Sequence, residues 1–145
     1  MSHYINNLTL PLFETFCRKT QVDGKTIEAK IGDNTLLLKV ATTPASQAQG
    51  YMGAKESPNE NEGIMFVYDE PMPLSFWMKN VNFPLDIMFF DSEMQCVGYE
   101  TMDPYRGEPD TAIKHYISKK PARFAVEVMA GWCSKNFKEG ATLSF

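Results

Sequence analysis

The sequence is poor in the residues that build common metal and disulfide sites. Its 145 residues include only two histidines, His3 and His115, and three cysteines, Cys17, Cys96 and Cys133. These residues lie far apart and form no Cys-x-x-Cys or His-x-x-x-His pair, so the usual zinc motifs are excluded. We therefore expect no metal and no cofactor, and we interpret the cysteines as reduced thiols, not as a disulfide framework.

Long apolar runs and familiar signature motifs are also missing. The longest apolar stretches, such as Leu85–Phe90, are much shorter than the ~18 residues of a membrane span. The N-terminus has no basic segment followed by an apolar stretch of the signal-peptide type. Phosphate-binding loops, Gly-x-Gly-x-x-Gly and Gly-x-Ser-x-Gly do not occur. These absences predict a protein with no membrane partner and no signal peptide, located in the cytoplasm or in a particle assembled there.

The composition is typical of one globular domain. Hydrophobic residues make up 43% of the chain and charged residues 22%, and the net charge is −4. A chain of this length and composition can form a single hydrophobic core. The acidic balance argues against a nucleic-acid partner, because such partners usually require a basic domain.

Short apolar runs separated by turn residues predict a chain made mostly of strands. The expected strands are Thr26–Ile31, Thr35–Ala41, Gly63–Tyr68, Leu74–Met78, Leu85–Phe90, Gln95–Thr101, Phe124–Val128 and Ala141–Phe145. The turn at residues 32–34 makes the first two strands a hairpin. A short helix is expected from Thr43-Pro44 to Gly50, and another at Gly131–Asn136. The predicted fold class is mainly β (β-rich α+β), a small barrel or sandwich-like single domain with two short helices.

The first 25 residues differ from the rest of the chain. Leu8, Leu10 and Leu12 alternate with polar Thr9 and with Pro11, and a proline confines such a strand to the edge of a sheet. We therefore expect an N-terminal arm or edge strand at residues 1–25 and a single β-rich domain at residues 26–145. Self-association through this arm is one expected interaction.

The densest group of chemically distinctive residues lies near the middle of the chain. Lys79 and Asn80 stand between two apolar runs, and Asp86 interrupts an apolar strand, where a carboxylate should be paired. Lys79 is the nearest cation in the sequence. One interpretation is a ligand pocket walled by Trp77 and Met78. The other, which the residues alone favour, is a structural polar bracket that holds the turn.

Glu127 is a single carboxylate inside another apolar strand. Strand alternation places it on the face opposite Val126 and Val128. There it either faces solvent or joins Lys79 and Asp86 from a neighbouring strand. Two carboxylates and a lysine that meet can support acid–base chemistry, or they can form a structural ion-pair network.

Several motifs stand in order along residues 26–145. They are Thr43-Pro44 with Gly50-Tyr51-Met52, Glu62-Gly63-Ile64-Met65-Phe66-Val67, Phe76-Trp77-Met78-Lys79-Asn80, Pro84-Leu85-Asp86 and Glu127-Val128-Met129-Ala130-Gly131. Together they resemble the bacterial and archaeal family called domain of unknown function 192, whose members are also similar to proteins of some phage genomes. The resemblance implies a compact, mostly β domain with no established activity. Val81 departs from the family pattern, which usually has threonine there.

We therefore expect a non-enzymatic binding or interaction module with no catalytic residue. The expected ligand-binding residues are Trp77, Met78, Lys79, Asn80, Asp86 and Glu127. The partner would be an unknown small ligand or a protein. One alternative is a structural or assembly protein, such as a phage virion component, that uses the N-terminal arm. The other is a hydrolase-like enzyme that uses the lysine and the two carboxylates.

Overall fold

The structure is a computed structural model that describes residues 22–138 and 140–145. The strands are β1 (Thr26–Ile31), β2 (Asn34–Ala41), β3 (Glu62–Met72), β4 (Ser75–Phe76), β5 (Leu85–Phe90), β6 (Cys96–Met102), β7 (Tyr116–Ile117), β8 (Ala122–Met129) and β9 (Leu143–Ser144). The helices are α2 (Pro44–Gln49), α3 (Trp132–Asn136) and a short 3-10 helix, η1 (Asp110–Ala112). The predicted edge strand at residues 8–12 and Cys17 lie outside the described residues, so the assembly role of the arm stays a prediction.

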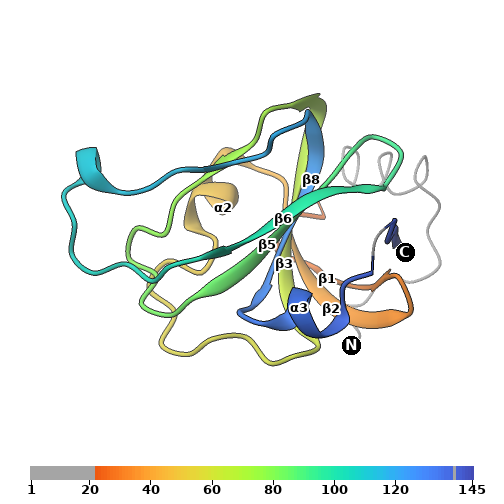
Figure 1. Ribbon diagram of the computed structural model, residues 1–145, viewed down its shortest axis with the longest axis horizontal. Coiled ribbons are helices and arrows are strands. Elements are labelled where there is room, and N and C mark those ends of the chain that lie inside the picture. Colours follow the sequence, from red (N-terminus) through yellow and green to blue (C-terminus); the bar gives the residue numbers. More distant parts are fainter. Residues whose placement is uncertain (1–21, 139) are drawn as a thin grey trace.

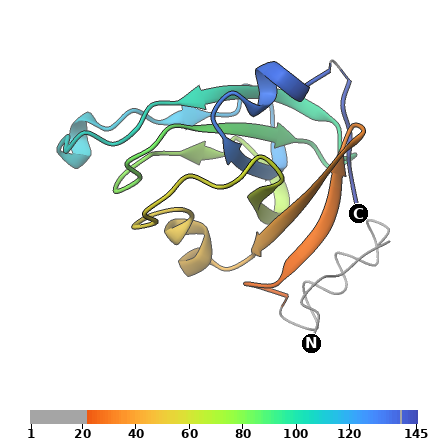
Figure 2. The same cartoon turned by 90° about the horizontal axis from the view of Figure 1, so that it is seen from below.

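The chain is mainly β, as the sequence predicts. Seven strands form one sheet in the order β6-β5-β8-β3-β2-β1-β9, and β4 pairs with β7 in a second, two-stranded sheet (Figure 1). All neighbours in the large sheet are antiparallel except β2 and β3. β1 and β2 run at a steep angle to β5 and β6, so the sheet is curled into a half-barrel (Figure 2).

The centre of the sheet is covered on both faces. All six residues of β5 are buried, whereas β1 buries only alternate residues along most of its length. Alternate residues of the central strands belong to two hydrophobic clusters. Phe124, Val126 and Val128 of β8 belong to the first cluster, with Trp132 of α3. Ala125 belongs to the second cluster, which lies on the other face of β8.

Helix α2 begins and ends where the sequence predicts. The Thr43 hydroxyl accepts a hydrogen bond from the Ser46 backbone N–H at 3.1 Å, and Pro44 is the first helical residue. The Asp23 carboxylate accepts hydrogen bonds from the Ser46 hydroxyl (2.6 Å) and from the Thr42 backbone N–H (2.7 Å). These bonds tie the start of the helix to the segment before β1. The helix ends at Gly50, whose φ of +44° suits glycine.

Several strand boundaries differ from the predicted ones, and two strands are much shorter than expected. The strand expected at Leu74–Met78 is reduced to β4, because the chain turns after it with a hydrogen bond from Val81 N–H to the Met78 carbonyl. The closing strand is reduced to β9, which lies at the sheet edge and pairs with the end of β1, and its Leu143 N–H also donates a hydrogen bond to the Met94 carbonyl at 2.8 Å. Residues 103–115 form an excursion that projects from the sheet, at the left of Figure 1.

None of the described helices is long and apolar enough to cross a membrane.

Gly63 in β3 allows β3 to pack closely against β8. A Cβ at this position would lie against the carbonyl oxygen of Glu127, and 3.1–3.2 Å from side-chain atoms of Leu38 and Val128. We expect Gly63→Ala to lower the free energy of unfolding by about 2–3 kcal/mol, because the packed backbone cannot move aside. Urea denaturation measures this loss. The control is Glu62→Ala, one residue earlier at an exposed position, and equal stabilities of the two variants would contradict the close packing.

Candidate functional site

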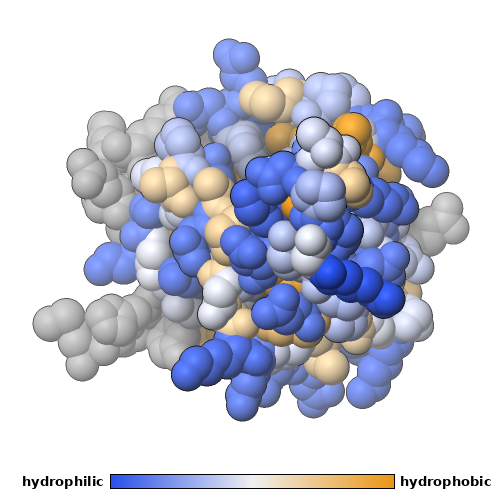
Figure 3. All heavy atoms as spheres, turned by 90° about the vertical axis from the view of Figure 1, so that its left-hand side faces the viewer, coloured by the Kyte–Doolittle hydropathy of each residue, from blue (hydrophilic) through white to orange (hydrophobic). Residues whose placement is uncertain are grey.

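A cavity of about 350 Å³ lies beside the second hydrophobic cluster. The end of α2, the residues after it, β3, β4, β8 and the excursion all contribute to its lining. Its aromatic lining residues are Tyr51, Phe66, Tyr68, Phe76 and Trp77, and its polar ones include Gln47, Ser75, Lys79, His115 and Glu127. On the side of the molecule from which the excursion projects, the outer surface is mostly hydrophilic, with smaller apolar patches between the hydrophilic side chains (Figure 3). A cavity of this size, with apolar walls and few polar groups, has the character of a small-molecule site.

Glu127 is the buried acid of this cavity. Its side chain lies opposite Val126 and Val128, as alternation predicts, and on the same face as the cavity instead of in solvent. The residue is only 5% exposed. No group of the described residues donates a hydrogen bond to its carboxylate, and burial raises its pKa to about 8. At neutral pH this carboxyl group is therefore mostly protonated, and a small rise in pH ionises it.

The end of α2 comes close to the same carboxylate. A Cβ built on Gly50 would lie 3.6 Å from Glu127 Oε1 and 3.5 Å from the Phe66 ring. These are ordinary contact distances, so glycine is needed here for the positive φ that ends the helix and not for space next to the acid.

Two tyrosines also face this acid. Burial, and then the negative charge of Glu127 and Glu62, raises the pKa of Tyr51 well above its ordinary value. Burial and the charge of Glu127 raise the pKa of Tyr68 to about 12. Both phenols consequently keep their protons at neutral pH and remain hydrogen-bond donors toward the cavity.

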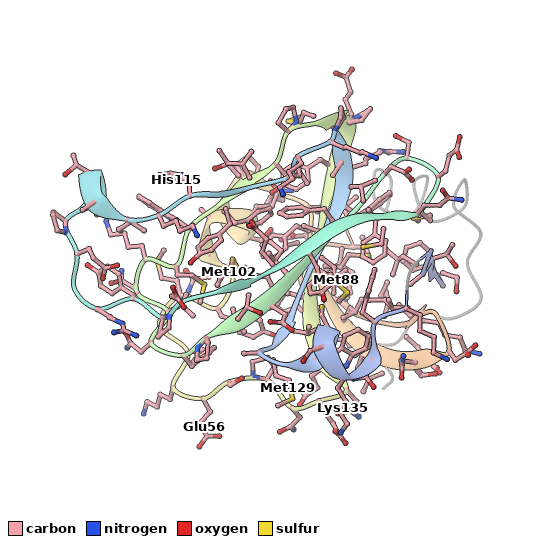
Figure 4. The ribbon with its side chains drawn as sticks, viewed as in Figure 1. Glu56, Met88, Met102, His115, Met129 and Lys135 are labelled. Carbon is pink, nitrogen blue, oxygen red and sulfur yellow. The ribbon has the colours of Figure 1, made fainter. Side chains whose placement is uncertain are left out.

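The outer wall of the cavity joins β4 and the following turn to the excursion. The Trp77 and His115 rings lie 5.6 Å apart between centroids. His115 Nδ1 lies 3.2 Å from the Ser75 hydroxyl, and Lys79 Nζ lies 2.9 Å from Asp110 Oδ2. Lys79 Nζ is also 5.6 Å from the centroid of the Trp77 ring. These contacts fix the excursion at the cavity rim, where Figure 4 shows His115 on its returning limb.

Asp86 lies on the opposite face of the sheet and organises α3. It is 1% exposed and accepts hydrogen bonds from the Thr101 hydroxyl (2.7 Å) and from the backbone N–H groups of Gly131 (3.1 Å) and Cys133 (2.9 Å). These bonds satisfy N–H groups at the start of the helix. In Figure 4, Met129 and Lys135 mark this side of the molecule, away from His115.

The expected pairing of Asp86 with Lys79 is therefore wrong. Asp86 is the register partner of Val128, whereas the next residue of β5, Ile87, is the partner of Glu127. Because successive residues of a strand point to opposite faces, Asp86 and Glu127 lie on different sides of the sheet. The structure does not bring Lys79 and the two carboxylates together.

Only some of the expected site residues line the cavity. Trp77, Lys79 and Glu127 line the cavity. Met78 is buried in the second hydrophobic cluster and Asn80 is exposed, and neither lines the cavity. Asn80 has a φ of +60° and its carbonyl accepts a hydrogen bond from the Gly53 N–H at 3.0 Å, so it shapes the turn.

Sequence reasoning missed several cavity residues. Tyr51 stood in a motif that the family resemblance used, but nothing marked it as facing a cavity. Phe66 and Tyr68 lie two residues apart in β3, and Phe66 is on the face of β3 that packs with the second cluster. Alternation alone could have placed them on one face, but only the pairing of β3 with β8 places that face next to Glu127.

The described residues offer no metal site. Within residues 22–138 and 140–145, no three His, Cys, Asp or Glu side chains are grouped so that they could hold a metal ion. Cys96 is half-buried and Cys133 is buried, and both are free thiols. Burial raises the pKa of both thiols, so neither is an activated nucleophile.

The chain is similar in structure to two bacterial proteins. One is a protein of unknown function from Novosphingobium aromaticivorans DSM 12444, with a TM-score of 0.75 and 22% identity over 83% of this chain and 86% of that one. The other, from Sinorhizobium meliloti 1021, is described as a candidate transcription regulator, with a TM-score of 0.71 and 22% identity over 81% of this chain and 91% of that one. At this identity the likeness shows the fold alone.

The comparison with protein families gives a more specific result. A search of curated proteins finds no match to this sequence. The domain of unknown function 192 family, described as an uncharacterized ACR, matches residues 26–145, the same span that carries the motifs. The chain therefore belongs to the domain of unknown function 192 family.

Proposed function

We propose that the protein is a non-enzymatic binding module that holds a small ligand in the cavity between Glu127 and Trp77. The observation that carries the proposal is a carboxylate on a residue that is only 5% exposed, which has no hydrogen-bond partner among the described residues and whose oxygen atoms are open to a cavity with aromatic walls. The polar groups of buried residues are normally paired, so an unpaired one that faces a cavity calls for an explanation. A ligand that pairs with Glu127 explains this one.

The walls support the proposal because contacts between rings hold several of them in place. The Phe66 and Phe76 rings meet edge to face with centroids 5.0 Å apart, and Tyr51 meets Phe83 in the same way at 6.2 Å. Rings fixed by such contacts lose little freedom when a ligand binds. The cavity is therefore suited to bind a ligand without first rearranging.

A hydrolase-like activity has weaker support. The arrangement closest to a catalytic pair is Ser75 with His115 at the rim, where both residues are exposed. Nucleophilic serine catalysis needs a third group that orients the imidazole ring. Among the described residues, no acidic side chain bonds to the second nitrogen of this ring.

The proposal is tested by filling the mouth of the cavity. Ala48 of α2 lines the cavity, whereas Ala45 of the same helix does not, and both are exposed. We expect that compounds found by a thermal-shift screen raise the melting temperature of the wild-type protein and of Ala45→Phe. The increase should be lost in Ala48→Phe, because the new ring occupies the binding space. A compound present at about 100 times its Kd stabilises the folded state by about 2.7 kcal/mol.

Two outcomes would overturn the proposal. In one, a library containing neutral, anionic and cationic compounds gives no stabilising compound at millimolar concentration. In the other, the compounds stabilise Ala48→Phe as much as Ala45→Phe, which would place the binding site elsewhere.

A further inference from the structure

We infer that the ligand is a small organic ammonium cation, with its nitrogen next to the Glu127 carboxylate and its alkyl groups against Tyr51, Phe66 and Trp77. This inference rests on the proposed function and specifies its ligand class.

Four polar side chains of the described residues are buried. They are Asp86, Ser118, Arg123 and Glu127. Asp86 accepts three hydrogen bonds, the Ser118 hydroxyl accepts one from the Leu74 N–H at 2.9 Å, and Arg123 Nε donates one to the Tyr68 carbonyl at 3.0 Å. Only Glu127 has no hydrogen-bond partner among these residues. A cation in the cavity would supply it, and would remove much of the cost of burying the acid.

The charge balance around Glu127 also favours a cation. The other charged side chain of the lining, Lys79, is already paired with Asp110 at 2.9 Å. The His115 ring is bonded to the Ser75 hydroxyl, and the raised pKa values of Tyr51 and Tyr68 keep both phenols neutral. The ionised Glu127 would therefore repel an anionic ligand and attract a cation.

The aromatic walls of the cavity also suit an organic cation. Aromatic rings attract cations through their electron-rich faces, and aromatic cages bind alkylated ammonium groups in this way. The Lys79 ammonium group already lies over the Trp77 ring, 5.6 Å from its centroid. A hydrated metal ion fits less well, because the cavity offers one carboxylate where hard metal ions take six or more oxygen ligands. The apolar walls match the alkyl groups of an organic cation.

The test compares pairs of compounds that differ mainly in charge. The first pair is choline and its neutral isostere, in which a carbon atom replaces the nitrogen, and the second pair is cyclohexylammonium and cyclohexanol. Binding to the full chain is measured by NMR titration at about pH 8.5, where Glu127 is largely ionised. We expect at least one cation to bind about tenfold tighter than its neutral partner, and to bind more weakly at about pH 6.

Matched variants assign this preference to one residue. The preference should disappear in Glu127→Gln and persist in Glu62→Gln, which makes the same change at an exposed glutamate outside the cavity lining. The pH dependence of the wild-type protein is a second readout that needs no variant, and the variants assign it to Glu127.

The possible failures can be told apart. Equal binding of both members of each pair would overturn the cation inference and leave the proposed binding function intact. Binding of neither pair, in a protein that still binds other screened compounds in the cavity, would also overturn the inference alone. If no compound of any class binds in the cavity, both the inference and the proposed function are wrong.

Discussion

Raising the pH from about 5 to about 9 is expected to destabilise the wild-type protein relative to Glu127→Gln by roughly 4 kcal/mol. The pKa of Glu127 is about 8 in the folded protein, against an ordinary value of 4.5. Between the unfolded pKa of 4.5 and the folded pKa of about 8, the folded state holds a proton that the unfolded state has released. Stability therefore falls as the pH rises through this range. The contribution is complete below the unfolded pKa and is lost as the pH rises through the folded one. Glutamine cannot ionise and lacks this dependence.

The measurement is urea denaturation of both proteins at about pH 5, 7 and 9. The two should have similar stability at the lowest pH, because glutamine resembles the protonated acid, and the variant should be the more stable one at the highest. Glu62→Gln is the control, since it removes an exposed carboxylate near the cavity and should keep the wild-type slope. Parallel pH profiles of wild type and Glu127→Gln would show that the acid is not desolvated.

Asp86→Ala is expected to lower the free energy of unfolding by about 3–5 kcal/mol. The substitution leaves the N–H groups of Gly131 and Cys133 without their acceptor at the buried start of α3, and removes the acceptor of the Thr101 hydroxyl. Asp86→Asn should cost much less, because its amide oxygen can still accept from the backbone. Chemical denaturation of the three proteins measures these differences.

Lys79 provides the control for this prediction. Lys79→Ala removes the exposed pair with Asp110 and the exposed contact with the Trp77 ring, and should cost about 1 kcal/mol or less. The double variant with Asp86→Ala should show additive losses, because the two residues share no partner. A loss below about 1 kcal/mol for Asp86→Ala, or a strong coupling to Lys79, would contradict the assigned role of Asp86.

Local patterns predicted the local structure well. The turn-favouring residues 32–34 predict the hairpin of β1 and β2. Thr43, Pro44 and Gly50 predict the start and the end of α2. The strand predicted at Leu85–Phe90 has the observed bounds of β5. In these cases the deciding interactions join residues that are close in sequence, so the sequence carries the information directly.

The pairing of distant segments was the part that the sequence could not supply. β8 lies between β3 and β5, although β6 and the excursion separate it from β5 in the chain. Alternation correctly placed Glu127 opposite Val126 and Val128, but it could not show that α2 and β4 cover that face. Asp86 and Lys79 were linked only because they are near in sequence. Lys79 instead pairs with Asp110, from a segment with no recognisable pattern.

The most direct test of the account is an NMR titration of the Glu127 side-chain carboxyl group, with and without choline. Both the binding function and the ligand class depend on this carboxylate being buried and unpaired. We expect a midpoint near pH 8 in the free protein, and a lower midpoint when choline is present, because a bound cation stabilises the ionised form. A midpoint near 4.5 that choline does not change would contradict it, since the group would then be hydrated or already paired.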